Sequence, residues 1–160
     1  MTDSAFVTPP LAIEPSFLDH NGHVNMAYHL VLVDRAIDLA FSAFRAGPDE
    51  YGATYGLTTF TGEMHVRYLA EMHAGDEIVG RVLLTEADAK RVIWTVELLR
   101  TADGAVVTTV EGVTLSVSIA TRRVTPFPDE LQALIAARVA QDREATAALD
   151  WRGRAVGMAR

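Results

Sequence analysis

The segment from Met26 to Ala46 constrains the fold of this chain more than any other stretch. Its polar side chains recur at the helical period on one narrow stripe, and nearly every other position is apolar. A helix with so much apolar surface has to be enclosed on most sides by other structure. Gly47-Pro48 predicts where it ends. The polar stripe consists of Asp34, Arg35, Asp38, Ser42 and Arg45.

Long strands follow this helix, separated by turn residues. Alternating or β-branched patterns predict strands at Thr58–Leu69, Glu77–Thr85, Arg91–Thr101 and Ala105–Ala120. Ala74-Gly75-Asp76 and Ala102-Asp103-Gly104 are predicted turns. Before the helix, residues 1–10 are predicted to be loose, without regular structure, and Leu11–Phe17 to form a short strand. After the helix, Asp49–Gly56 is predicted to be a loop.

A last helix is expected at about residues 128–149. Asp129 and Glu130 suit its N-terminus, Trp151 is expected to pin the start of a C-terminal tail, and one face is apolar. That face consists of Leu131, Leu134, Ile135 and Val139.

These elements predict an α+β fold: an antiparallel sheet of successive hairpins wrapped around one apolar helix, with an additional C-terminal helix. A chain of 160 residues fits a single domain, with its core at about 10–125. An open edge in so small a sheet favours pairing of two copies.

Composition excludes several classes of function. The net charge of -7 disfavours nucleic acid or an anionic membrane as partner. The absence of cysteine excludes disulfides, thiolate metal sites and a cysteine nucleophile, and it fits a cytoplasmic protein. The N-terminus shows no signal-peptide pattern, and no stretch is apolar enough for a membrane span. His65 and His73 are poorly spaced for metal, so no metal site and no cofactor are expected.

The loop before the helix carries the densest chemistry in the chain. Asp19 can act as a base or a nucleophile, and His23 as a base, acid or hydrogen-bond donor. Gly22 permits a tight turn, and Asn25 suits a helix N-cap. A carboxylate facing the N–H groups of a helix N-terminus could attack and polarise a carbonyl. The alternative is an Asx-rich turn that only caps the helix.

The run Asp19-x-Asn21-Gly22-His23-Val24-Asn25, followed by Tyr28, resembles the active-site loop of hotdog-fold thioesterases. These are the 4-hydroxybenzoyl-CoA thioesterase-like enzymes and the plant acyl-carrier-protein thioesterases. The resemblance implies a hotdog fold and hydrolysis of an acyl-CoA thioester to free acid and CoA. It also implies a homodimer or homotetramer with active sites between subunits.

The resemblance also implies roles for the loop residues. Asp19 matches the catalytic carboxylate, as base or as nucleophile, and Asn21 and His23 match residues implicated with it. Backbone N–H groups near Asn25 and Met26 would bind the thioester oxygen. CoA and acyl-carrier protein both stay open as the thiol carrier.

Further site residues are expected on the strands. Glu63 shares a strand face with His65. We expect Glu63 to act as a second carboxylate or to orient the substrate, and the alternative is a simple ion pair with Arg67. His29 lies on the apolar side of the helix, as a core histidine or a site residue. Two basic pairs are candidates for CoA phosphates, with plain solvation as the alternative: Lys90 with Arg91, and Arg122 with Arg123.

A narrower resemblance points to the betainyl-CoA thioesterases. It adds to the loop the motifs Glu63-x-His65-x-Arg67-x-Leu69 and Ala74-Gly75-Asp76. A quaternary ammonium group cannot donate a hydrogen bond and is best held by aromatic rings beside a carboxylate, here Glu63. Each available ring also has an ordinary core interpretation. The rings are Tyr28, Tyr55, Phe60 and Trp94.

Two other functions compete. An enoyl-CoA hydratase-type hotdog enzyme has Pro after the Asn and His five positions after the Asp, whereas here Gly22 follows Asn21 and His23 lies four positions after Asp19. A non-catalytic hotdog protein that binds acyl-CoA would not need Asp19. Release of free thiol from acyl-CoA distinguishes an enzyme from this binding protein.

Overall fold

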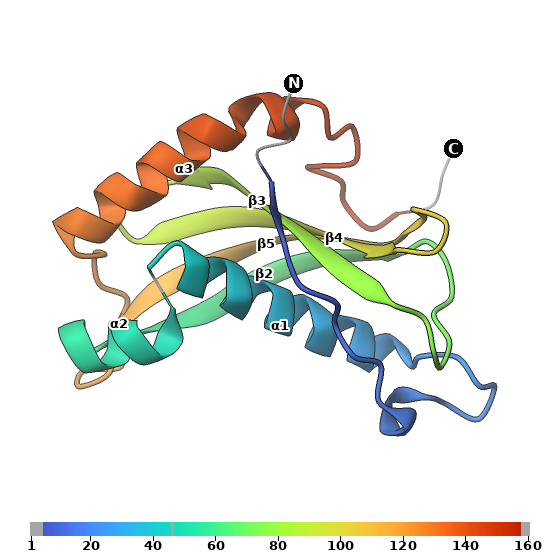
Figure 1. Cartoon of the computed structure of the whole chain (residues 1–160). Coiled ribbons are helices and arrows are strands. Elements are labelled where there is room, and N and C mark those ends of the chain that lie inside the picture. The colour runs from blue at the N-terminus through green and yellow to red at the C-terminus, as the bar shows by residue number, and fades with distance from the viewer. Residues whose placement is uncertain (1–4, 46, 158–160) are drawn as a thin grey trace.

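Helix α1, Met26–Ala43, lies along one face of a five-stranded antiparallel sheet (Figure 1). The computed structural model describes residues 5–45 and 47–157. Helix α3, Asp129–Ala147, packs along β3. The α+β prediction is confirmed. The strands are β1 Phe6–Val7, β2 Leu57–Tyr68, β3 Ile78–Ala87, β4 Arg91–Arg100 and β5 Val106–Ser118.

Helix α1 begins at an Asn cap and packs closely on the sheet. The Asn25 side chain accepts a hydrogen bond from the Ala27 N–H at 3.0 Å. A Cβ at Gly80 would lie 2.6 Å from the Ala36 Cβ, so a side chain at this point of β3 would push the helix away. The helix ends at Ala43, and the predicted end at Ala46 lies outside the described residues. The buried side chains of α1 are His29, Leu32, Val33, Ala36, Ala40 and Phe41.

The order of strands in the sheet is β1-β3-β4-β5-β2. β3, β4 and β5 form the predicted hairpins, but β2 pairs with β5 and not with β3. The prediction of successive hairpins is therefore wrong for β2. Residues 69–77 are too long for a tight turn, and they cross from β2, at one edge of the sheet, to β3, which is next to the opposite edge strand β1. They bury Met72 fully on the way.

Two N-terminal predictions are also wrong. Leu11–Phe17 is not a strand: Leu11 makes one bridge to Ile78, and Pro15–Phe17 is a 3-10 helix because Pro15 fixes φ for a helical first turn. The strand of this region is β1, inside the segment expected to be loose.

The predicted loop at Asp49–Gly56 is the short helix α2, Pro48–Tyr55. Pro48 at its first position and Gly56 with φ of 65° after its end are the relevant signals. Tyr51 is buried and hydrogen-bonds Ser116 at 2.6 Å, and this tertiary contact stabilises a helix too short to be stable alone.

The C-terminal predictions are mostly confirmed. Leu131 and Ile135 are buried and Val139 packs on the core, whereas Leu134 is exposed. Trp151 is nearly buried and donates to Glu97 at 3.1 Å, so it pins the tail as expected. In residues 5–45 and 47–157 no helix has the length and apolarity that crossing a membrane requires.

Candidate active site

The loop before α1 is a tight hairpin that holds Asp19 beside the helix N-terminus. Leu18 and Val24 form a bridge, the Asp19 N–H donates to the His23 carbonyl at 2.8 Å, and the Gly22 N–H donates to the Asp19 carbonyl at 3.0 Å. Gly22 has φ of 81°, a conformation that residues with a side chain rarely adopt. The turn therefore needs glycine at this position.

Backbone N–H groups set the charge state of Asp19. Its Oδ1 accepts from the Asn21 N–H at 2.8 Å and from the His23 N–H at 3.4 Å. The Asn21 N–H, above all, holds the pKa of the Asp19 carboxyl below its usual range. Asp19 is thus ionised at neutral pH, as a base or a nucleophile must be. Asn21 is exposed, His23 is half-buried, and His20 is solvent-facing as expected.

A surface cavity of about 350 Å³ opens between this loop, the first turn of α1 and the end of β2. At the start of α1 the Asn25 N–H donates to the Phe17 carbonyl, and the Ala27 and Tyr28 N–H groups donate to Asn25. The Met26 N–H, beside this cavity, is therefore the donor that has no partner in the described residues, and it carries the partial positive charge of the helix N-terminus. On one cavity, a carboxylate can attack a carbonyl directly or through water, and such an N–H group can stabilise the charge that develops on the oxygen. The cavity is lined by Asp19, His23, Val24, Met26, His29, Tyr68, Leu69, Ala70 and Glu71.

His29 belongs to both the core and this cavity. It is buried, its Nδ1 lies 2.6 Å from the Thr108 hydroxyl, and its ring meets Tyr68 edge-on at 5.1 Å. Burial lowers the pKa of His29, so the imidazole is neutral at neutral pH. This position is compatible with both predictions for His29, a core histidine and a site residue.

Sequence reasoning missed Tyr68 and Glu71 as cavity residues. Tyr68 belonged to the alternation of a strand, and its hydroxyl donates to the Met26 carbonyl at 3.4 Å. Glu71 lies in the crossing segment, and its carboxylate is 3.4 Å from His23 Nε2. No local pattern marks Glu71, because its neighbour His23 comes from a distant part of the chain.

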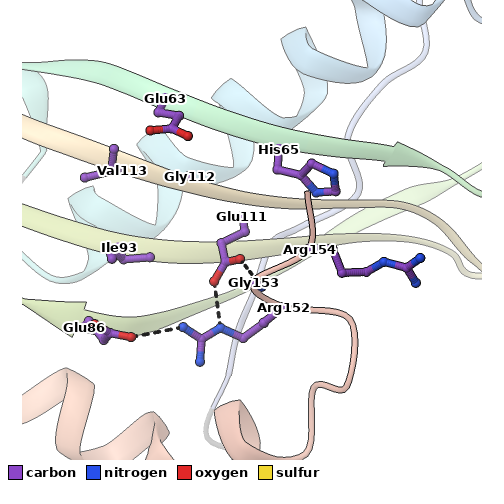
Figure 2. Close-up of a pocket in the computed structure, with 10 residues that line it drawn as sticks. All are labelled: Glu63, His65, Glu86, Ile93, Glu111, Gly112, Val113, Arg152, Gly153 and Arg154. Atoms are coloured by element: carbon purple, nitrogen blue, oxygen red, sulfur yellow. Dashed lines mark hydrogen bonds and ion pairs between the residues drawn. The ribbon is translucent and has the colours of Figure 1, made fainter. Parts of the chain in front are cut away.

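Glu63 and His65 lie on a different cavity from Asp19 within this chain. Figure 2 shows them beside Glu111 and Arg152. Glu111 accepts hydrogen bonds from Arg152 Nε at 2.9 Å and from the Gly153 N–H at 2.7 Å. The roles of Glu63 and His65 in catalysis stay predictions, and one chain alone does not bring them to Asp19.

The four rings expected to hold a cationic acyl group do not gather. Tyr28 stacks on Phe17 with ring centroids 4.5 Å apart. Tyr55 donates to Glu130 at 3.4 Å, and Trp94 is fully buried. Phe60 lies under the Arg122 guanidinium, at 5.5 Å.

The two basic pairs lie at the same end of the sheet, far from Asp19. Arg91 and Phe60 both pair with Leu115 of β5, and the Ser118 N–H donates to the Arg123 carbonyl. Lys90 is exposed, and Arg91 forms an ion pair with Asp88 at 2.6 Å. Leu115 is seven positions along β5 from Thr108, the residue that contacts His29, which corresponds to roughly 23 Å.

Sequence comparison finds relatives along most of the chain. A Pseudomonas aeruginosa protein named betainyl-CoA thioesterase is 28% identical over 155 residues, covering 97% of this chain and 94% of that protein. A Rhizobium meliloti protein named L-carnitine dehydrogenase/betainyl-CoA thioesterase is 27% identical over 148 residues, which are 92% of this chain. This chain spans only 29% of that longer relative.

Structural comparison supports the same fold. A Staphylococcus aureus protein solved in complex with CoA superposes with a TM-score of 0.85 at 22% identity, covering 99% of this chain and 98% of that one. The family model of the thioesterase-like superfamily matches residues 13–135. The predictions of a hotdog fold and of a thioester hydrolase are thereby confirmed, and the chain belongs to the thioesterase-like superfamily.

Proposed function

We propose that this protein hydrolyses acyl-CoA thioesters, with Asp19 as general base or nucleophile. One observation carries the proposal: an ionised carboxylate is held by a tight turn on the same cavity as the N-terminus of α1. The relatives named betainyl-CoA thioesterase and the CoA complex of the Staphylococcus aureus protein support CoA as the thiol carrier.

Both chemistries use the same groups. As a base, Asp19 takes a proton from water, the hydroxide adds to the thioester carbonyl, the C–S bond breaks, and the proton on Asp19 passes to the leaving CoA thiolate. As a nucleophile, Asp19 adds to the carbonyl itself and expels the thiolate, and water then cleaves the mixed anhydride. In both cases the Met26 N–H at the start of α1 would bind the carbonyl oxygen as it becomes negative.

A betainyl group is the acyl group that this cavity suits. The lining includes the carboxylates of Asp19 and Glu71 and the ring of Tyr68, and within residues 5–45 and 47–157 it contains no lysine or arginine. A trimethylammonium group is attracted by carboxylates and by aromatic faces. In this proposal Tyr68 and Glu71 replace the four rings and Glu63 as the groups that meet the cation.

Two copies of the chain would complete the CoA site. The outer edge of the sheet is β2, and Phe60, Met64 and Tyr68 of this strand are exposed. If two β2 strands pair antiparallel about a two-fold axis, the Phe60 end of one strand lies beside the Tyr68 end of the other. The basic residues near Phe60 in one copy then approach the Asp19 cavity of its partner.

The test is thiol release from a panel of acyl-CoA esters by wild-type protein, Asp19→Asn and Asp34→Asn. Asp34 is exposed on α1, away from the cavity, so its variant is the matched control. We expect Asp19→Asn to lower kcat by about 10²–10⁴-fold while substrate binding is kept. Asp34→Asn should match the wild type.

The panel should include betainyl-CoA and its neutral isostere 3,3-dimethylbutanoyl-CoA. One cation–π contact of about 0.5–2 kcal/mol corresponds to a preference of roughly 2- to 30-fold in kcat/KM for the cation. Equal or faster hydrolysis of the isostere would refute the specificity for the betainyl group but not the thioesterase activity. Binding of acyl-CoA without release of thiol from any ester would instead favour a non-catalytic binding protein.

A further inference from the structure

We propose that His23, Glu71 and His73 form a binding site for a divalent transition-metal ion of the Zn²⁺ class. One ligand atom from each of the three lies within 4.8 Å of the other two. No spacing in the sequence indicates this group, because His23 belongs to the loop before α1 and the other two belong to the segment that crosses between β2 and β3.

The distances fit a tetrahedral ion. Glu71 Oε2 lies 3.4 Å from His23 Nε2 and 3.7 Å from His73 Nε2. Ligands about 2.0–2.1 Å from a tetrahedral Zn²⁺ are about 3.3 Å apart. Small rotations of these exposed or half-buried side chains are therefore enough to close the site around an ion.

The backbone holds the two histidines in register. His23 and His73 face each other in an antiparallel bridge, and the Val24 N–H donates to the Met72 carbonyl at 2.8 Å. The imidazole centroids lie 5.0 Å apart, edge to face. A bridge of this kind fixes both Cα positions, so little backbone ordering is required when an ion binds.

The Asp76 carboxylate lies near one of the proposed ligands, His73. Asp76 Oδ2 lies 3.9 Å from His73 Nδ1 and accepts from the His73 N–H at 2.9 Å. Arg100 lies 3.7 Å from the same carboxylate oxygen. Histidines that bind metal through Nε2 commonly have a carboxylate near Nδ1, which orients the ring and raises its basicity.

Two imidazoles and one carboxylate select the class of ion. Imidazole nitrogen favours Zn²⁺, Co²⁺ or Ni²⁺ over Mg²⁺ and Ca²⁺, which prefer oxygen ligands. Three protein ligands leave one tetrahedral position for water or another small group. Because His23 and Glu71 also line the Asp19 cavity, the ion would lie at its rim.

The experiment measures metal binding without any thioester. Metal-free, untagged protein is titrated with ZnCl₂ by calorimetry and with CoCl₂ by visible absorption. We expect one ion per chain, and His73→Asn should weaken affinity by about 100-fold or more, since losing only a supporting carboxylate commonly costs 10–100-fold. His20→Asn should bind as the wild type does, because His20 is exposed in the same loop but outside the group.

Glu71→Gln provides a second variant that removes a ligand, and the melting temperature of every metal-free variant reports folding. The proposal is overturned if wild-type protein shows no saturable site, or if His73→Asn and Glu71→Gln both bind as tightly as His20→Asn. In that case the three side chains only contact one another and hold no ion. Metal binding is measured without thioester and hydrolysis is measured on metal-free protein, so the metal site and the proposed activity can fail independently.

Discussion

The backbone next to Asp19, the proposed base or nucleophile, favours the charged form of its carboxylate. Its carboxylate accepts N–H groups from Asn21 and His23, and the turn that presents them depends on the positive φ of Gly22. These hydrogen bonds favour the charged form, which lowers the pKa of Asp19. The same contacts therefore shape the loop and keep the carboxylate ionised.

A pH profile tests this assignment. If ionised Asp19 is the essential base or nucleophile, activity is complete above its pKa and is lost only as pH falls through it. Because that pKa lies below the usual 3.8, kcat/KM should be flat from about pH 8 down to about pH 5. Thiol release at constant ionic strength measures the profile, and circular dichroism confirms folding at each pH. A fall in kcat/KM centred near pH 6.5 would assign the essential ionisation to a histidine instead.

Helix α3 acts as a cover for the edge of β3. Asp142 is fully buried, and its Oδ2 accepts from the Leu84 N–H and from Arg138 Nε, both at 2.9 Å. Leu84 lies two residues beyond the last described pairing of β3 with β1, at Val82. The carboxylate thus satisfies an edge N–H that lies beyond the pairing with β1 in the described residues.

We expect Asp142→Ala to lower the free energy of unfolding by about 3 kcal/mol. The change leaves the buried Leu84 N–H and the largely buried Arg138 guanidinium without this acceptor. Urea unfolding measures the effect, with Glu144→Ala, at an exposed position on the same helix, as control within about 0.5 kcal/mol. An equal loss in both variants would mean that Asp142 has no special role.

At the scale of the whole molecule, β2 is an edge strand of the sheet in a single chain, and one side of it is free to pair with another strand. Exposed apolar side chains lie along it, and the basic residues at its far end are distant from Asp19 in the same copy. A two-fold arrangement resolves both features by covering the edge and bringing basic residues to the cavity.

Met64→Glu tests that arrangement. In a two-fold pairing of β2 edges, the new charges of the two copies lie close together and repel. We expect wild-type protein to be a homodimer or larger by light scattering, and Met64→Glu to shift toward monomer with loss of activity. Leu134→Glu, at an exposed apolar position on α3, should keep the wild-type mass. A monomeric, fully active wild type would contradict the proposed assembly.

Local patterns were sufficient for most elements and for the reactive loop. The helical period of α1, the alternation of the strands and the turn residues around Gly75 and Gly104 were readable because each depends on neighbours a few positions away. Asp19, Asn21, His23 and Asn25 were identified for the same reason, since one short turn holds them together.

Contacts between distant parts of the chain had no such signature. Helix α2 depends on Tyr51 reaching Ser116, and the placement of β2 beside β5 depends on which sheet edge is free. Glu63 was predicted as a second carboxylate, as a substrate-orienting residue or as a partner of Arg67, and that role stays a prediction. Within one chain the pleat and the sheet order put Glu63 on another cavity than Asp19.

The sequence by itself determined which residues form the helices, strands and the carboxylate-bearing turn, because side-chain periodicity and turn chemistry act over a few residues. Only the tertiary structure decided what surrounds Asp19. Tyr68 lies at that loop because β2 pairs with β5, and Glu71 and His73 reach it because residues 69–77 then cross to β3. That pairing is selected by burial of the whole apolar surface of the chain, a quantity that no short stretch of sequence contains.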